Sequence, residues 1–131
     1  MKKKKAQEVI VTQTSRASNQ TSEIRSFIHY YEAVNNTISF MYQENEDYRV
    51  HITLDSNQLA CMRIGESNTF CWFVQGEQTP LLKDSEVGPL LLTTSTNTFQ
   101  YLDGVAIVEY DLFMDQEKID TIKMTWEIIR K

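Results

Sequence analysis

The chain has 131 residues and a formal net charge of −5, and 41% of its residues are hydrophobic. This length fits one domain whose core needs neither disulfides nor a metal, and no run approaches the ~20 apolar residues of a membrane span. Lys2–Lys5 supply four of the 13 basic residues, so residues 6–131 hold nine against 18 acidic ones. This acidic body argues against nucleic acid as a partner, and we expect a soluble protein with no membrane partner.

The basic start, Met1–Lys5, is typical of the beginning of a signal peptide, but no apolar segment follows it. We therefore place the protein in the cytoplasm, with its two cysteines as reduced thiols. Residues 1–6 are predicted to be a disordered basic end. Residues 7–131 are predicted to be a single domain, because no repeat, linker or low-complexity stretch interrupts them.

Apolar and polar residues alternate with period 2 along most of the chain, which predicts β-strands. Turn-forming residues separate the strands, such as Asn35-Asn36 and Asp103-Gly104. The expected strands lie at residues 7–15, 22–34, 38–42, 48–54, 60–64, 70–74, 90–101, 108–114 and 122–128. Residues 77–87 remain unassigned. Residues 23–33 have a short amphipathic helix as their alternative, since Ile24, Phe27, Ile28 and Tyr31 also fall at helical spacing.

Eight to ten short strands with tight connections predict an antiparallel meander. Such a sheet has two exposed edges unless it closes. A closed barrel of about eight strands has room for packed side chains or one small ligand. We therefore expect an all-β meander barrel, with a two-sheet sandwich as the competing architecture.

A series of short motifs resembles the YwiB-like family, small bacterial proteins of unassigned function with a calycin (lipocalin-like) β-barrel. The motifs, in order, are Ile-Ser-Phe-Met-Tyr-Gln-Glu at 38–44, Arg-Ile-Gly at 63–65, Phe-Val-Gln-Gly-Glu at 73–77, Gly88 before a Thr-rich strand, and Val-Glu-Tyr at 108–110. Family members usually have Tyr-x-Thr before this glycine, where Lys83 and Ser85 stand here. The resemblance implies the fold and a bacterial cytoplasmic setting, and it implies no activity.

The four strands between residues 38 and 74 fall into one register if their three loops have odd lengths. One sheet face then carries only uncharged residues, including Tyr42 and Trp72. The other face carries Phe73, and on it Arg49 lies opposite Arg63 and His51 opposite Cys61. The same register places Cys61 opposite Cys71.

Two arginines opposed on a sheet repel one another, so their pairing in an acidic chain suggests an anion site. Guanidinium groups match carboxylates and phosphates, and a protonated histidine adds a donor. We expect Arg49, Arg63 and His51 to be polar contacts of a ligand, with Tyr42, Trp72 and Phe73 as apolar walls. The plainer alternative is a barrel exterior whose arginines form salt bridges of little energetic value.

Two histidines and two cysteines form no metal-binding motif, and no hydrolase or phosphate-binding motif occurs. We therefore expect no metal, no cofactor and no catalytic residue. A Cys61 thiolate activated by His51 is kept as a hypothesis.

The leading functional hypothesis is a non-enzymatic binder of a small anionic or amphipathic ligand in the barrel lumen. The alternative is a protein-interaction module or homodimer that uses a sheet face or edge, and an enzyme ranks third. A binder requires a cavity of a few hundred Å3. An interaction module requires a filled lumen and an exposed apolar patch.

Overall fold

A computed structural model describes residues 6–130, and ten β-strands account for nearly all of them. None of these residues forms a helix that is long and apolar enough to cross a membrane. The strands are β1 (Ala6–Ser15), β2 (Gln20–Val34), β3 (Thr37–Gln43), β4 (Arg49–Leu54), β5 (Gln58–Ile64), β6 (Thr69–Val74), β7 (Gln78–Ser85), β8 (Gly88–Leu102), β9 (Val105–Met114) and β10 (Glu117–Arg130).

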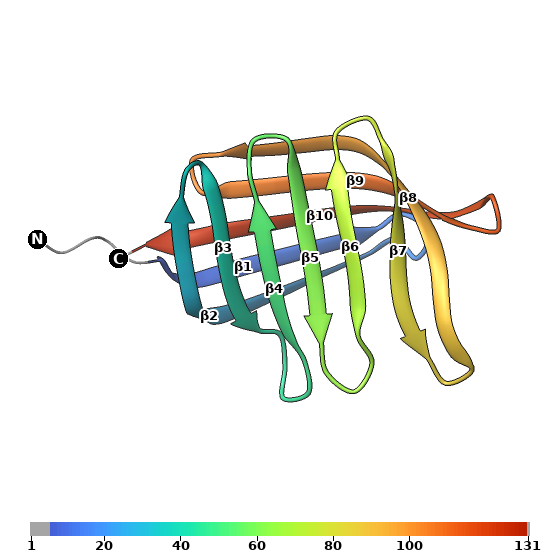
Figure 1. The fold of residues 1–131 in the computed structure, drawn as a ribbon, viewed down its shortest axis with the longest axis horizontal. Helices are drawn as coiled ribbons and strands as arrows, with labels where there is room; N and C mark the ends of the chain where they lie inside the picture. The colour runs from blue at the N-terminus through green and yellow to red at the C-terminus, as the bar shows by residue number, and fades with distance from the viewer. Residues whose placement is uncertain (1–5, 131) are drawn as a thin grey trace, which may run out of the picture.

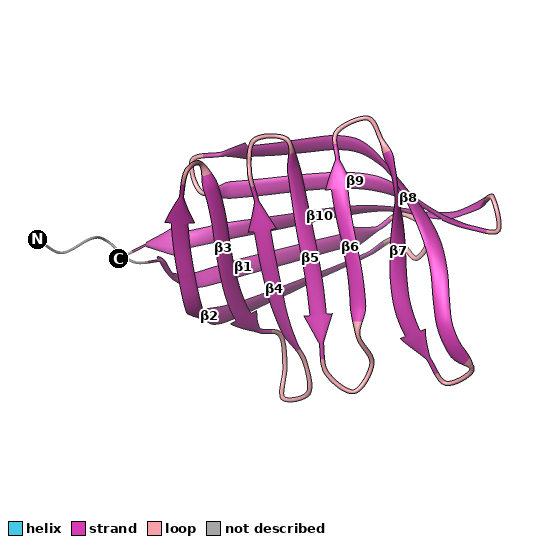
Figure 2. Cartoon of the chain, in the orientation of Figure 1, coloured by secondary structure: helices cyan, strands magenta, loops and turns pink. Residues whose placement is uncertain are grey.

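Each strand pairs antiparallel with the next, and β1 pairs with both β2 and β10, so the sheet closes into a barrel. The barrel is flattened: β3–β7 form the front layer, with the end of β2 beside β3 and the start of β8 beside β7. The strands β9, β10 and β1 and the rest of β2 and β8 cross behind them at a steep angle (Figure 1). The predicted all-β meander barrel is confirmed. Residues 23–33 lie within β2, so their helical alternative is wrong, and the unassigned segment 77–87 supplies β7 (Figure 2).

Two predicted turns are confirmed by their backbone conformation. Asn35 and Asn36 have φ angles of 52° and 66°, and Asp103 and Gly104 have 53° and 79°. Asparagine, aspartate and glycine tolerate this left-handed region, which a two-residue hairpin turn requires. The basic end predicted at residues 1–6 lies outside the described residues except for Ala6, the first residue of β1.

The predicted register of β5 and β6 against β4 is wrong by one residue. Leu54 pairs with Leu59, because the turn between them is even in length rather than odd. The Asp55 carboxylate accepts the backbone N–H groups of Asn57 (2.7 Å) and Gln58 (3.1 Å), and the Asp55 N–H donates to the Gln58 carbonyl (3.0 Å). A slip of one residue exchanges the two faces of a strand, so the residues of β5 and β6 lie on the opposite sheet face from the one on which the predicted register placed them.

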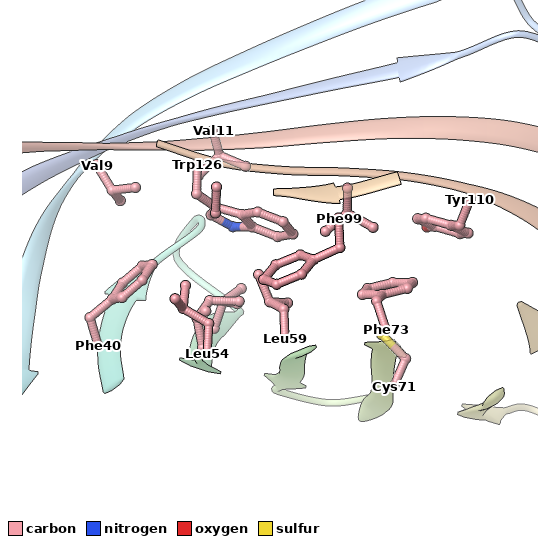
Figure 3. Close-up of a cluster of buried hydrophobic side chains, with 14 of the residues drawn as sticks. Val9, Val11, Phe40, Leu54, Leu59, Cys71, Phe73, Phe99, Tyr110 and Trp126 are labelled. Atoms are coloured by element: carbon pink, nitrogen blue, oxygen red, sulfur yellow. The ribbon is translucent and has the colours of Figure 1, made fainter. Parts of the chain in front are cut away.

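The core occupies part of the barrel interior (Figure 3). Phe40, Leu54 and Leu59 from one layer and Val9 and Trp126 from the other are almost fully buried. None of these five except Trp126 lines the main cavity. The lumen is therefore packed over part of its length and hollow over the rest.

Candidate functional site

The hollow part of the lumen is a cavity of about 620 Å3. Both layers contribute to its wall, which is mostly apolar and aromatic. Val50 and Phe73 come from the front layer, and Val11, Tyr110 and Trp126 come from the back layer. A cavity of this size suits one small molecule, because ligand pockets commonly measure about 300–1,000 Å3.

A polar row crosses three neighbouring strands at the rim of this cavity. Arg63 of β5 pairs with Thr69 of β6, which pairs in turn with Lys83 of β7, and all three line the cavity. Neighbouring strands lie about 4.8 Å apart, so an anion above Thr69 is within reach of both cationic side chains. Within the described chain, the Lys83 ammonium makes no ion pair and the Thr69 hydroxyl makes no hydrogen bond.

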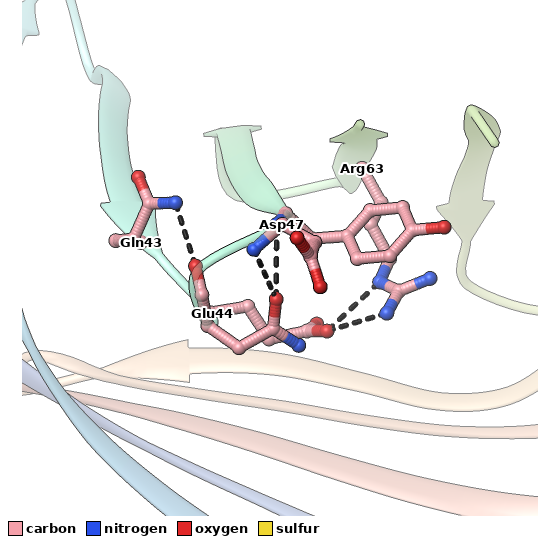
Figure 4. Close-up of polar contacts among 6 residues, drawn as sticks. Gln43, Glu44, Asp47 and Arg63 are labelled. Atoms are coloured by element: carbon pink, nitrogen blue, oxygen red, sulfur yellow. Dashed lines mark hydrogen bonds and ion pairs between the residues drawn. The ribbon is translucent and has the colours of Figure 1, made fainter. Parts of the chain in front are cut away.

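The guanidinium of Arg63 is held by two neighbours (Figure 4). Its Nε and Nη2 donate to Oε2 of Glu44 at 2.9 and 2.6 Å, and its Cζ lies 3.7 Å from the ring centroid of Tyr48. The hydrogen bonds that Arg63 donates to Glu44 are the main factor that raises the pKa of Arg63. Arg63 is therefore charged and oriented in the absence of a ligand.

The β3–β4 loop places both neighbours of Arg63. The Asn45 side chain accepts the backbone N–H groups of Asp47 (2.8 Å) and Tyr48 (3.0 Å), and the Glu44 N–H donates to the Tyr48 carbonyl (2.9 Å). The loop also fits closely against Gly65. A Cβ at that position would lie only 2.4 Å from Cδ1 of Tyr48 and 2.5 Å from the Asp47 carbonyl oxygen.

Four neutral donor groups also line this cavity. Cys61 and Cys71 face one another across β5 and β6, as predicted, and both are free thiols. The hydrogen bond with Cys61 and burial raise the pKa of Cys71. Burial also raises the pKa values of Tyr42 and Tyr110, so both phenols stay protonated.

Three of the six predicted site residues line the cavity, and three do not. Tyr42, Arg63 and Phe73 face the lumen. Arg49 pairs with Ile64, and His51 pairs with Met62. Arg49, His51 and Trp72 lie on the outer face. The even β4–β5 turn places Arg49 and Arg63 on opposite faces of the sheet.

The same turn removes the basis of the Cys61 thiolate hypothesis. Cys61 lies opposite Ile52 and faces the lumen, whereas His51 faces outward. The expected pairing of His51 with Cys61 is therefore wrong. No group of three or more metal-ligating side chains occurs in residues 6–130.

Sequence reasoning missed Thr69 and Lys83 as site residues. Lys83 lies in the segment 77–87, where alternation predicted no strand, so its pairing with Thr69 was not foreseen. One signal was present: only eight lysines and arginines occur in residues 6–130, and Lys83 is one of them.

Comparison with known proteins bears on the fold. A family model described as a domain of unknown function (DUF1934) matches residues 8–125. The chain is similar to the crystal structure of the ywiB protein from Bacillus subtilis, with 21% sequence identity and a TM-score of 0.68, over 98% of this chain and 95% of that chain. No curated protein matches the chain in sequence. At this identity, the structural likeness shows a shared fold.

Proposed function

The chain belongs to the DUF1934 family, which has no assigned function, and we propose that its barrel binds a small amphipathic anion in the lumen without catalysing a reaction. The predicted relationship to the YwiB-like proteins is confirmed, but it assigns no ligand. The proposal therefore rests on the cavity itself.

The row Arg63–Thr69–Lys83 is the observation that carries this proposal. It combines two cations with a free hydroxyl at the rim of a cavity whose wall is mostly apolar and aromatic. Only one carboxylate, that of Glu44, pairs with the row, so the rim keeps one positive charge. A single anionic group at the rim and an apolar body inside would satisfy both parts of the wall.

Decanoate and decanol test this proposal, because they share an apolar chain and differ in charge. We expect decanoate to bind more tightly than decanol in titration calorimetry. Lys83→Met should weaken decanoate binding about 10-fold or more, since a charge-assisted hydrogen bond contributes about 1.5–3 kcal/mol. Decanol binding should change little.

Arg49→Met is the matched control, because it removes a cation from the outer face of the neighbouring strand β4. We expect it to leave both affinities unchanged. Equal weakening by Lys83→Met and Arg49→Met would mean that general charge, not the rim, attracts decanoate. Absence of decanoate binding to the folded wild-type protein would contradict the proposal.

A second candidate function, self-association, is favoured by an apolar row on the outside of the barrel. Met62, Phe70, Leu82 and Leu91 pair successively across β5–β8, and three of them are among the exposed large hydrophobic residues. Two acidic copies of this chain repel one another, but an uncharged row offers a surface where they can meet. This candidate does not exclude the first, because the row and the cavity lie on opposite faces of the sheet.

A further inference from the structure

We propose that the lumenal ligand carries a neutral acceptor oxygen, such as a ketone, which receives a hydrogen bond from Tyr110 inside the cavity. This inference rests on the proposed binding function and specifies the ligand class. A saturated carboxylate would satisfy the rim alone. The inner wall, by contrast, presents hydrogen-bond donors that the protein does not use.

Tyr110 is the clearest of these unused donors. Its side chain is 6% exposed and lines the cavity, and its ring is held against Phe73 with a centroid separation of 4.6 Å. Its hydroxyl makes no hydrogen bond within residues 6–130. The hydroxyl oxygen itself keeps some accessible surface, so it opens into the cavity, where an acceptor supplied by the ligand can reach it.

Tyr42 provides a second free donor on the facing wall, at the level of the rim, because Tyr42 pairs with Val50 and Val50 pairs with Arg63. Its oxygen accepts the indole N–H of Trp126 at 3.0 Å, which leaves its own O–H free to donate. Both thiols act electrostatically on Tyr110, and Cys61 also acts on Tyr42. Asp120, and no lysine or arginine of the described chain, is the charged group that acts on Tyr110, so a neutral acceptor suits this phenol better than a second anion.

The separation between the two parts of the site sets the position of the acceptor. Cys61 and Cys71 lie two residues farther into the lumen than Arg63 and Thr69. Two residues along a strand span about 7 Å, a distance that roughly five or six methylene groups cover. Both thiols act electrostatically on the Tyr110 phenol, so an acid with its ketone at carbon 7 brings its acceptor to the level of these groups when its carboxylate is at the rim.

Three acids of equal chain length test the inference: decanoate, 4-oxodecanoate and 7-oxodecanoate. The two keto acids have the same composition and differ only in the ketone position. We expect 7-oxodecanoate to bind wild-type protein about 3- to 10-fold more tightly than 4-oxodecanoate, the gain expected from one neutral hydrogen bond. Tyr110→Phe should abolish this preference, so that the two keto acids bind the variant with equal affinity.

The outcomes separate this inference from the function on which it rests. If decanoate binds in a Lys83-dependent manner but the two keto acids bind equally, the ligand-class inference is wrong and the binding function stands. A preference for 7-oxodecanoate that survives Tyr110→Phe also overturns it. If none of the three acids binds, both proposals fail. A thermal melt shows that Tyr110→Phe is folded, and no loss of stability is expected because the hydroxyl has no partner to lose.

Discussion

At the scale of single residues, the hydrogen bond between Trp126 and Tyr42 links the two layers of the barrel. Trp126 on β10 is fully buried, and its indole N–H donates to the Tyr42 hydroxyl on β3. An indole donor has no acceptor function of its own, so it depends on this single oxygen. Tyr42 therefore has a structural role in addition to its place in the cavity wall.

Tyr42→Phe should lower the free energy of unfolding by about 1–3 kcal/mol, because it leaves the buried Trp126 N–H without a partner. Urea denaturation measures this change. Tyr110→Phe is the matched control: it removes the same atom from the same cavity but breaks no hydrogen bond, so it should have little effect or a slightly stabilising one. Equal losses in both variants would show that hydration of the phenols, not the Trp126 bond, accounts for the change.

At the scale of elements, the close fit of the β3–β4 loop against Gly65 links a turn to the anion site. Tyr48 lies both against the Arg63 guanidinium and where a Gly65 side chain would be. Any side chain at position 65 must therefore displace Tyr48 or the strand end. The orientation of Arg63 depends on a glycine that does not itself touch the cavity.

Gly65→Ala should lower the free energy of unfolding by about 1–3 kcal/mol through overpacking and should also weaken decanoate binding. Gly76→Ala is the control, because a Cβ added at position 76 would meet no atom within 4 Å, although the φ of +76° is unfavourable for alanine. We expect it to cost about 1–2 kcal/mol of backbone strain without changing affinity. Calorimetric titration of both folded variants compares them, and equal affinities would contradict a role of Gly65 in holding Tyr48.

The elements also show how far sequence reasoning reaches. Alternation and turn residues predicted nearly all the strands, because each signal is local. The register of β5 and β6 could not be predicted in this way, since both faces of these strands are apolar: Leu59, Cys61, Cys71 and Phe73 face inward, and Ala60, Met62, Phe70 and Trp72 face outward. Only the length of the β4–β5 turn decides between the faces, and that length depends on hydrogen bonds of the Asp55 side chain.

Only part of the candidate site could be predicted, because the rest of it depends on the same strand register. Tyr42 and Phe73 follow from burial, and Arg63 was selected through a pairing with Arg49 that does not exist. Lys83 joins the site only because β7 pairs with β6, a tertiary relation with no local signal. A basic cluster was expected, but the register decides which residues form it, and Lys83 rather than Arg49 accompanies Arg63.

At the scale of the whole molecule, the part of the sheet formed by β5–β8 carries apolar side chains on both sides. Its inner side borders a cavity of about 620 Å3, and its outer side carries the row from Met62 to Leu91 and a hollow of about 430 Å3 lined partly by Phe70 and Trp72. An exposed apolar row is typical of an interface. The two predicted signatures, a cavity for a binder and an apolar patch for an interaction module, therefore occur in one barrel.

Self-association through the outer row predicts a concentration-dependent dimer that charge abolishes. Leu82 and Leu91, with 45% and 64% of their surface exposed, pair directly with each other, so lysine at both positions would place like charges against their copies in a two-fold contact. Sedimentation velocity should show wild-type protein shifting from monomer to dimer with concentration and the double variant remaining monomeric. Leu102→Lys, an equally exposed position at the far end of β8, should still dimerise. A wild-type protein that stays monomeric would contradict self-association, and decanoate binding by the monomeric double variant would show that the lumen acts independently of the outer face.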